Sequence, residues 1–405
     1  MSFQQGLSGL SAAAKNLDVI GNNVANANTA GFKQGVAEFG DVFAASLGGG
    51  GGAQVGIGTM VSGVNQQFTQ GNISTTSNPL DVAINGKGFF RMSDHGAISY
   101  TRNGGFMLDK DGYIVGSGGE NLTGFQALNG SIVPGVLVNL QLSSADLLPK
   151  TTGNAAVGAN LSSSAPVLPA AGFVATNPST YNFSTASTAF DSLGQSHTMT
   201  FYFNKTAANT WAVNTYVDGA AANGAGVSTL TFDSQGVIST LTPPTNLVKT
   251  AVLTNGAAPL SITMDFSAMS QFGSGFGVNS LSQDGYASGQ LSGYDIGNDG
   301  IILGRYTNGQ TQKLGQIALS NFTNPQGLSP LGGSMFAETS GSGIPLTGGP
   351  GTASLGLLQS AAKEDSNVDL TAELVNMITA QRVYQANAQS IKAQDAVLQT
   401  LVSMR

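Results

Sequence analysis

The sequence predicts a multidomain α+β protein, in which long coiled-coil-like α-helices at the two ends form an inner domain and two mainly antiparallel β domains lie between them. Apolar residues recur at heptad spacing near both ends. Short apolar stretches in the middle are separated by Asn-Gly and Asp-Gly pairs, which favour tight turns between strands. Between residues 151 and 281 the composition shifts to Ala, Ser, Thr, Asn and Pro, which indicates one β domain inserted into the other.

These observations divide the chain into four parts. The predicted parts are a terminal helical polymerisation domain (1–30 plus 366–405), a connecting segment (31–78), an inner β domain (79–150 plus 282–365) and an outer inserted β domain (151–281). The glycine run at 48–52 predicts a flexible connection.

Composition argues against several functional classes. Charged residues make up 9% of the 405 residues, so uncharged polar side chains and 56 glycines must cover most of the surface. The net charge of −7 argues against binding nucleic acid. No basic run and no apolar stretch of about 20 residues is present, which argues against membrane insertion. Cysteine is absent, which excludes disulfides and thiolate chemistry. Residues 1–21 do not resemble a signal peptide, so export would require a route without signal cleavage.

The N-terminal pattern predicts an amphipathic helix that needs a partner. Its apolar residues alternate at spacings of three and four, the seam of a coiled coil, and a lone helix of this length is marginal in water. The candidate polymerisation residues of this helix are Leu7, Leu10, Ala14, Leu17, Ile20 and Val24.

A second helix is predicted at the C-terminus, where neither Gly nor Pro occurs from residue 367 to 405. An unbroken helix over this range is about 50 Å long. Ser366 and Asp369 resemble a capping box at its start. Its candidate polymerisation residues are Leu370, Leu374, Met377, Tyr384, Ala388, Ile391, Leu398 and Val402. Either copies of the chain assemble through these ends, or the two ends pair with each other inside one domain.

Turn and strand signals organise the middle of the chain. Asn-Gly or Asp-Gly pairs stand at residues 85–86, 103–104, 111–112, 129–130 and 308–309. Alternating aromatic and β-branched residues predict that His197–Asn204 and Trp211–Val217 are paired strands. The similar sequences Phe190–Gly194 and Phe232–Gly236 predict recurring turn chemistry rather than a repeat architecture.

No constellation of residues indicates catalysis. His95 and His197 have no ligand-spaced neighbours, which predicts surface histidines rather than metal or acid–base residues. Asp-Lys-Asp-Gly at 109–112 lacks the remaining ligands of a calcium loop, which favours a hairpin turn. No nucleophile elbow or phosphate-binding glycine pattern is present. We therefore expect a protein that is not an enzyme and binds no cofactor or metal.

Four sequence blocks resemble motifs of the bacterial flagellar rod and hook axial proteins. The first contains Leu-Asp-Val-Ile-Gly-Asn-Asn-Val-Ala-Asn from Leu17 and Thr-Ala-Gly-Phe-Lys from Thr29. The last runs from Ser366 to Arg405, and Leu80–Phe90 and Tyr100–Asp109 are similar to the family's β-domain motifs. The residues that match the N-terminal family motif are Asn22, Asn23, Asn26, Thr29, Gly31, Phe32 and Lys33.

The resemblance implies a structural subunit whose terminal helices surround a channel while its β domains stack outward. The chain length and the inserted β domain favour the hook branch of the family, whose curved, flexible tube acts as a universal joint between rod and filament. The implied partners are further copies of the chain, the rod proximally, the hook–filament junction protein distally, and the hook cap and type III export apparatus during assembly. The implied location is extracellular. The alternatives are a distal-rod subunit with an unusual insertion and a secreted β-rich adhesin.

Overall fold

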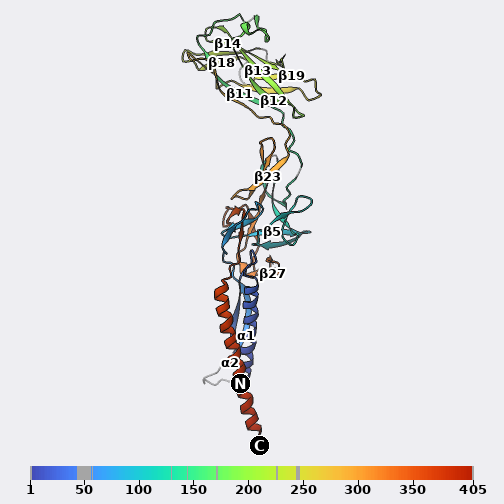
Figure 1. Ribbon diagram of the computed structural model, residues 1–405, viewed down its shortest axis with the longest axis vertical. Coiled ribbons are helices and arrows are strands. Elements are labelled where there is room, and N and C mark those ends of the chain that lie inside the picture. Colours follow the sequence, from blue (N-terminus) through green and yellow to red (C-terminus); the bar gives the residue numbers. More distant parts are fainter. Residues whose placement is uncertain are drawn as a thin grey trace. The chain divides into compact units, whose positions relative to one another are not determined.

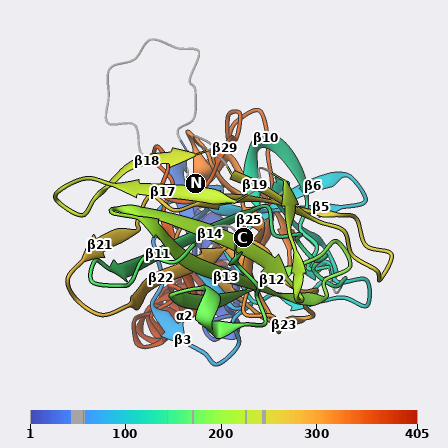
Figure 2. The same ribbon diagram turned by 90° about the horizontal axis from the view of Figure 1, so that it is seen from above.

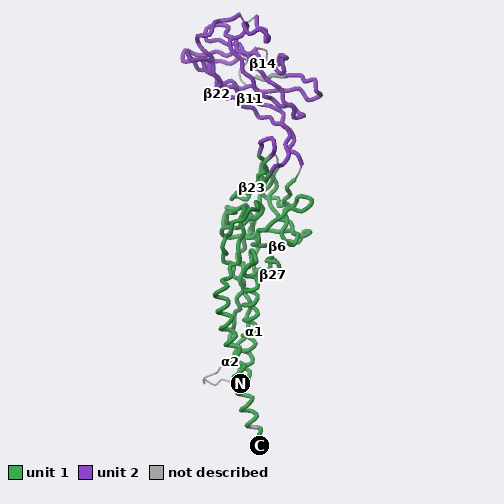
Figure 3. The backbone as a smooth tube through the Cα atoms, in the orientation of Figure 1, with its two compact units in different colours: residues 1–143, 293–305, 311–405 green, residues 144–292, 306–310 purple. Residues whose placement is uncertain are grey.

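The chain divides into two compact units. The computed structural model describes residues 2–42, 56, 58–128, 130–143, 145–169, 172–224, 227–242 and 247–403. Unit 1 comprises residues 1–143, 293–305 and 311–405, and unit 2 comprises residues 144–292 and 306–310 (Figure 3). Unit 2 therefore begins before and ends after the range 151–281. The glycine run at 48–52 lies outside the described residues.

Two long helices lie side by side in unit 1, as the heptad patterns predict (Figure 1). Helix α1 spans Ser2–Ala25 and helix α2 spans Leu370–Ser403. A β-carbon added at Gly6 would lie 3.0 Å from Ile391 Cγ1, and one added at Gly9 would lie 2.9 Å from Asn387 Oδ1. These glycines let the helices approach closely, and their partners show that the helices run antiparallel. The two ends therefore pair within one unit, and their outward faces are left for other contacts.

The start of α2 is fixed by Asp369. Its Oδ1 accepts hydrogen bonds from the backbone N–H groups of Thr371 (2.9 Å) and Ala372 (3.1 Å). The predicted capping box with Ser366 is wrong, because the Ser366 hydroxyl accepts from Val368 N–H, before the helix begins. Asp369 alone is the N-cap, in the geometry usual for that position.

A β-hairpin packs against α1 in the segment where the sequence predicts only a connection. Strand β1 (Gly35–Val42) pairs antiparallel with β2 (Gly58–Gln66), with a register shift between Glu38 and Phe39. Both strands contact α1. The described residues of the segment 31–78 therefore include a pair of antiparallel strands.

The β body of unit 1 is a largely antiparallel sheet with two short ribbons. Its strands are β3 (Ile73–Thr75), β4 (Val82–Asn85), β5 (Phe89–Asp94), β6 (Ala97–Thr101), β7 (Met107–Leu108), β8 (Ile114–Val115), β9 (Asn121–Leu128), β10 (Ser131–Asn139), β23 (Leu291–Ile296), β24 (Ile301–Tyr306), β25 (Thr311–Ile317), β26 (Leu319–Asn321), β27 (Ser329–Gly332), β28 (Met335–Ala337), β29 (Leu346–Gly348), β30 (Leu357–Ser360) and β31 (Ala362–Glu364). The main path of the sheet is β23-β24-β25-β9-β5-β6-β28-β27, and the ribbons are β3–β31 and β4–β30. Phe89 and Phe90 belong to different core clusters, since successive side chains of a strand point to opposite faces.

Unit 2 is a sandwich of two sheets around one core. Its strands are β11 (Asn154–Ser162), β12 (Phe183–Phe190), β13 (Ser196–Ala207), β14 (Thr210–Val217), β15 (Ala220–Ala221), β16 (Asn223–Gly224), β17 (Ser228–Phe232), β18 (Ile238–Thr242), β19 (Leu247–Ala251), β20 (Leu260–Asp265), β21 (Ser270–Phe272) and β22 (Gly277–Gln283). One sheet has the order β16-β19-β20-β11-β21, with β22 beside β11. The other has the order β12-β13-β14-β17-β18, which can be followed in Figure 2. The core contains Val157 of β11 and Phe266, which follows β20, on the side of the first sheet. On the side of the second sheet it contains Phe201 of β13 and Trp211 of β14. The predicted strand pair is confirmed as β13 and β14.

The turn signals are confirmed in part. Pairs at 111–112 and 308–309 close the hairpins β7–β8 and β24–β25, and residues 129–130 connect β9 to β10, although residue 129 lies outside the described residues. Those at 85–86 and 103–104 close no hairpin, since β4 pairs with β30 and β6 pairs with β5 and β28.

Recurring turn chemistry is confirmed. Asp109, Asp191 and Asp233 each accept, through Oδ1, hydrogen bonds from the backbone N–H groups two and four residues later. The residue three positions on is in each case a glycine, with φ between 79° and 82°. The carboxylate closes the turn while glycine supplies its left-handed backbone.

Candidate functional site: a buried polar junction at the roots of the terminal helices

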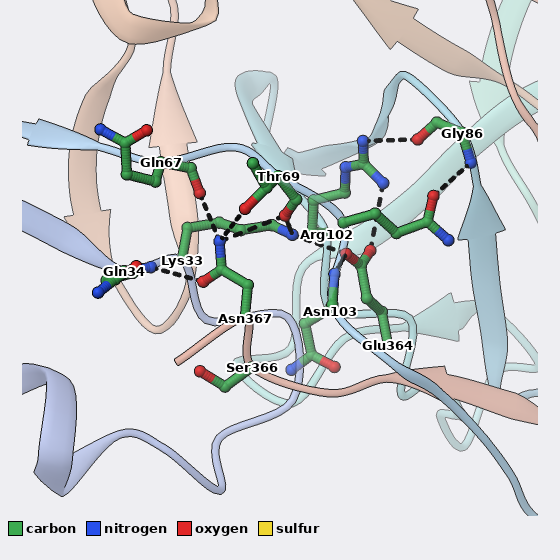
Figure 4. Close-up of polar contacts among 12 residues, drawn as sticks. Lys33, Gln34, Gln67, Thr69, Gly86, Arg102, Asn103, Glu364, Ser366 and Asn367 are labelled. Atoms are coloured by element: carbon green, nitrogen blue, oxygen red, sulfur yellow. Dashed lines mark hydrogen bonds and ion pairs between the residues drawn. The ribbon is translucent and has the colours of Figure 1, made fainter. Parts of the chain in front are cut away.

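The segment that follows α1 and the segment that precedes α2 meet in a buried polar cluster (Figure 4). We call it the junction, and it consists of Lys33, Gln34, Arg102, Glu364 and Asn367. Lys33 Nζ donates to Glu364 Oε1 at 2.6 Å, and both side chains are fully buried. This ion pair joins residues 331 positions apart in the sequence. The two ends of the chain are thus held to each other outside the helices as well.

Arg102 completes the ion cluster. Its Nη1 donates to Glu364 Oε2 at 3.2 Å and its Nη2 donates to the carbonyl oxygen of Gly86 at 2.8 Å. The guanidinium also lies 5.4 Å from the ring centre of Phe89, within the range of a cation–π contact. Glu364 Oε1 accepts a further hydrogen bond from Gly71 N–H at 2.9 Å. One carboxylate therefore connects three separate segments of the chain.

The charges of the cluster are not balanced. Two cations, Lys33 and Arg102, share one anion, Glu364. Burial lowers the pKa of Lys33 and of Arg102, and the Glu364 carboxylate opposes this effect at both. The carbonyl oxygen of Thr69 supports the ammonium at 2.7 Å. Removing one member of such a buried set leaves an uncompensated charge, which is strongly destabilising.

Amides extend the junction to both helices. Asn367 Oδ1 accepts from Gln34 N–H at 2.8 Å, and Asn367 Nδ2 donates to the carbonyl oxygen of Gln67 at 2.7 Å. Gln34 Nε2 donates to Glu373 Oε1 in the first turn of α2 at 2.6 Å. Near the end of α1, the buried Asn23 makes two hydrogen bonds with the backbone of Gly35 (2.8 and 2.9 Å). The end of α1 and the first turn of α2 are therefore both hydrogen-bonded to the segment that follows α1.

The N-terminal motif residues fall into two groups. Asn23, Gly31 and Lys33 are buried in or beside the junction, whereas Asn22, Asn26, Thr29 and Phe32 form the turn that leaves α1. In that turn Asn26 Nδ2 donates to Asn22 Oδ1 at 3.0 Å and Thr29 Oγ1 donates to Asn26 Oδ1 at 3.2 Å.

Gly31 has a specific steric role. Its φ is +70°, and a β-carbon there would lie 2.4 Å from the backbone nitrogen of Asn103. Its own N–H donates to the carbonyl oxygen of Glu364 at 2.8 Å. Only glycine allows the chain to pass this close to the β body.

The candidate polymerisation residues lie partly between the helices and partly outside them. In α1, Ile20 is buried, Leu10, Ala14, Leu17 and Val24 are half-buried, and Leu7 is exposed. In α2, Met377, Ala388 and Ile391 are half-buried, whereas Leu370, Leu374, Tyr384, Leu398 and Val402 are exposed. Among the described side chains of α2 the buried ones are Glu373 and Ala380, and neither is a candidate polymerisation residue. The pair within the chain therefore leaves an apolar stripe of α2 uncovered.

The two histidines have different environments. His95 is exposed beside Asp94, as predicted. The prediction for His197 is wrong, because it is buried between two carboxylates: its Nδ1 lies 2.6 Å from Asp218 Oδ2 and its Nε2 lies 3.1 Å from Asp191 Oδ2. Carboxylates only accept hydrogen bonds, so an imidazole that bonds to both is doubly protonated. Burial alone lowers the pKa of His197, but the hydrogen bonds to Asp218 and Asp191 outweigh it and raise the pKa.

The described residues contain neither a metal cluster nor a membrane-spanning helix. No group of three or more His, Cys, Asp or Glu side chains in the described ranges has a metal-binding arrangement. None of the helices in the described part of the chain combines the length and the hydropathy needed to cross a bilayer.

Family models match most of the chain in four stretches. They are a flagella basal body rod protein model (3–33), a flagellar hook protein FlgE/F/G D1 domain (83–153), a flagellar basal body protein FlaE D2 domain (160–286) and a flagellar basal body rod FlgEFG protein C-terminal model (359–404). The first match ends at Lys33 and the last includes Glu364. The buried ion pair thus links the two terminal matches.

Relatives match along the whole chain. The flagellar hook protein FlgE of Escherichia coli is 43% identical over 412 residues and that of Salmonella typhimurium is 42% identical over 413 residues, each comparison covering 100% of both chains. The protein of the same name from Rhizobium meliloti is 33% identical, over 100% of this chain and 98% of the relative.

A solved structure supports the fold. The crystal structure of Helicobacter pylori flagellar hook protein FlgE2 aligns with a TM-score of 0.53 and 15% sequence identity, over 72% of this chain and 99% of that one. Full-length identity to hook proteins favours the hook branch over a rod subunit or an adhesin. The chain belongs to the flagellar hook protein family, whose members are structural subunits of the bacterial flagellum.

Proposed function

We propose that this hook subunit assembles with further copies of itself through the outward faces of its two terminal helices. The observation that carries the proposal is the apolar stripe of α2 formed by Leu370, Leu374 and Ile378, which are all exposed although α2 is already paired with α1. Exposed apolar patches of this kind mark interaction sites. Covering a Leu or Ile side chain contributes about 1.5–3 kcal/mol, so a few such residues per subunit stabilise a polymer of many contacts.

The junction gives the helices a mechanical role in this proposal. The end of α1 and the start of α2 both lead to the same buried cluster, because Lys33 follows α1 and Glu364 precedes α2. A load applied to the helices is therefore passed to the β body through buried ionic and amide hydrogen bonds. This arrangement suits a curved tube that bends while it transmits torque, as a universal joint does.

The proposed partners follow from membership of the family. They are the rod on the proximal side, the hook–filament junction protein on the distal side, and the hook cap and type III export apparatus during assembly. The proposed location is the extracellular hook, reached without signal cleavage. The low charge content, 9% of residues, supports a surface of polar contacts that rearrange at small cost.

Electron microscopy of polymers from purified variants tests the proposal. Leu374→Asp should abolish tube formation, because a carboxylate would be desolvated without a partner between subunits. Gln389→Asp is the matched control, since it places the same charge at an exposed polar position of the same helix. This control should form normal tubes, and circular dichroism should show both variants folded. Normal tubes from Leu374→Asp would show that the stripe is not used in assembly.

A further inference from the structure

A groove with a volume of about 540 Å³ runs along α1, between α2 and the β1–β2 hairpin. Its floor includes the small residues Gly9, Ala12 and Ala13 of α1. Val383 of α2 and Phe39 of β1 stand on its two sides. The separation of two packed helices depends on the side chains between them, so a floor of small residues admits another helix closely.

The groove is long enough for several turns of helix. Its lining extends along α1 from Gly9 to Asn23, a rise of about 21 Å at 1.5 Å per residue. The lining residue that carries a charge is Glu373, whose carboxylate already accepts hydrogen bonds from Gln34 (2.6 Å) and Asn23 (3.5 Å). An uncharged helix could therefore enter without leaving a charge unpaired.

The last two turns of α2 have the matching properties. Val397, Leu398 and Val402 are 62%, 55% and 76% exposed, and they follow Ile391, the residue in close contact with Gly6. The C-terminal end of α2 extends past the N-terminal end of α1 (Figure 1). Residues 396–403 include no charged side chain. This segment is about 12 Å long as a helix, so it fits within the length of the groove. One unit thus carries a concave apolar surface and a projecting apolar segment, neither of which is covered by the described part of the chain.

We infer that the groove of one copy receives residues 396–403 of α2 from a second copy. The inference rests on the proposed self-assembly and names the surfaces that carry it. Contacts between two different surfaces of the same subunit are heterologous, and when they do not close into a ring they generate an open helical polymer. A contact between identical surfaces would instead form a closed pair. Groove and helix end together therefore provide the kind of contact that a tube requires.

Cysteine crosslinking tests this contact directly, because the chain contains no cysteine of its own. Val402→Cys marks the end of α2 and Val383→Cys marks the groove. The two variants are mixed, allowed to form tubes and treated with a short bifunctional thiol reagent. A covalent dimer should form in the mixture and not in tubes of either variant alone. Val375→Cys is the matched control, since residue 375 is also an exposed valine of the same helix (59%, against 48% for Val383) but does not line the groove.

Each outcome bears on the inference. Tubes that form normally but yield no dimer in the Val402→Cys and Val383→Cys mixture would overturn it and leave the assembly proposal standing. A dimer of equal yield with Val375→Cys would overturn it too, because the helix end would then not be specific to the groove. A dimer from Val402→Cys alone would show that the helix ends meet each other instead. Failure of the unsubstituted protein to form any tube would count against the proposed function itself.

Discussion

The junction of unit 1 and the Asp191–His197–Asp218 cluster of unit 2 both bury charged side chains, but they differ in span and in charge balance. The junction joins residues 331 positions apart and places two cations on one carboxylate. The unit 2 cluster joins residues 6 and 21 positions apart and places one imidazolium between two carboxylates. The first holds the two ends of the chain together, whereas the second fixes neighbouring turns. The sequence span of each cluster, rather than its chemistry, therefore decides which parts of the chain it holds together.

The largest expected effect is at Glu364. Glu364→Gln leaves Lys33 and Arg102 buried without an anion and should lower the free energy of unfolding of unit 1 by about 3–5 kcal/mol. Lys33→Met is the comparison variant, because it leaves Arg102 and Glu364 as a balanced ion pair. It should therefore lower the free energy of unfolding by less than Glu364→Gln does. Hydrogen exchange followed by mass spectrometry would locate the loss. Equal costs for the two variants would show that charge balance is not what stabilises the junction.

Gly31→Ala should have the next largest effect. A β-carbon 2.4 Å from Asn103 N and a φ of +70° should together cost about 2–3 kcal/mol in unfolding free energy. Gly130→Ala is the control, since its φ is +75° but no atom lies near the added carbon. Thermal denaturation should show a clearly smaller loss, of about 1 kcal/mol, for the control. A similar loss in both would mean that backbone strain alone explains the glycine.

The smallest expected effect depends on pH. The folded pKa of His197 is raised above 6.5, so its stabilisation is complete below pH 6.5 and is lost as pH rises through the folded value. Burial raises the pKa of Asp191, but hydrogen bonds, first from His197, outweigh it and lower the pKa to about 2 from 3.8, so its contribution is lost as pH falls toward 2. His197→Gln should therefore cost most between pH 3.8 and 6.5, by about 1–2 kcal/mol, and least at alkaline pH. Urea denaturation measures the loss of unfolding free energy. A loss that does not change with pH would contradict the claim that His197 is positively charged in the folded protein.

Local patterns predicted the elements that local interactions determine. The heptad spacing gave both helices, and the Asp and Gly of the turns at 109–112, 190–194 and 232–236 act within five residues of each other. The sequence does not predict the hairpin β1–β2, because glycines interrupt the apolar alternation of its strands and a glycine run indicates a flexible connection. For helices, turns and hairpins, the sequence pattern agrees with the structure where no glycine interrupts the spacing of apolar residues.

The junction could not be predicted in this way. Lys33 and Glu364 belong to no periodic pattern, and their contact depends on how the whole β body folds between them. Resemblance to a family singled out Lys33 but gave it no physical role. His197 reaches Asp218 only through the register of β13 and β14, in which Met199 lies opposite Val217. Sequence spacing does not reveal a strand register, so the sequence alone predicts an exposed His197 where the structure has a buried one.

The span of the Lys33–Glu364 pair has a kinetic consequence. Closing a chain loop costs more entropy as the loop lengthens, by about 0.6 kcal/mol for each doubling. The turns that begin with Asp109, Asp191 and Asp233 close loops of a few residues, whereas this ion pair closes a loop of 331 residues. We therefore expect the turns and sheets to form early in refolding and the two chain ends to dock last, which pulse-labelling hydrogen exchange would detect as late protection of α1 and α2. A subunit that folds in this order completes the helices through which we propose that it assembles only after the rest of the molecule, so the order of events along the folding pathway would suppress premature polymerisation.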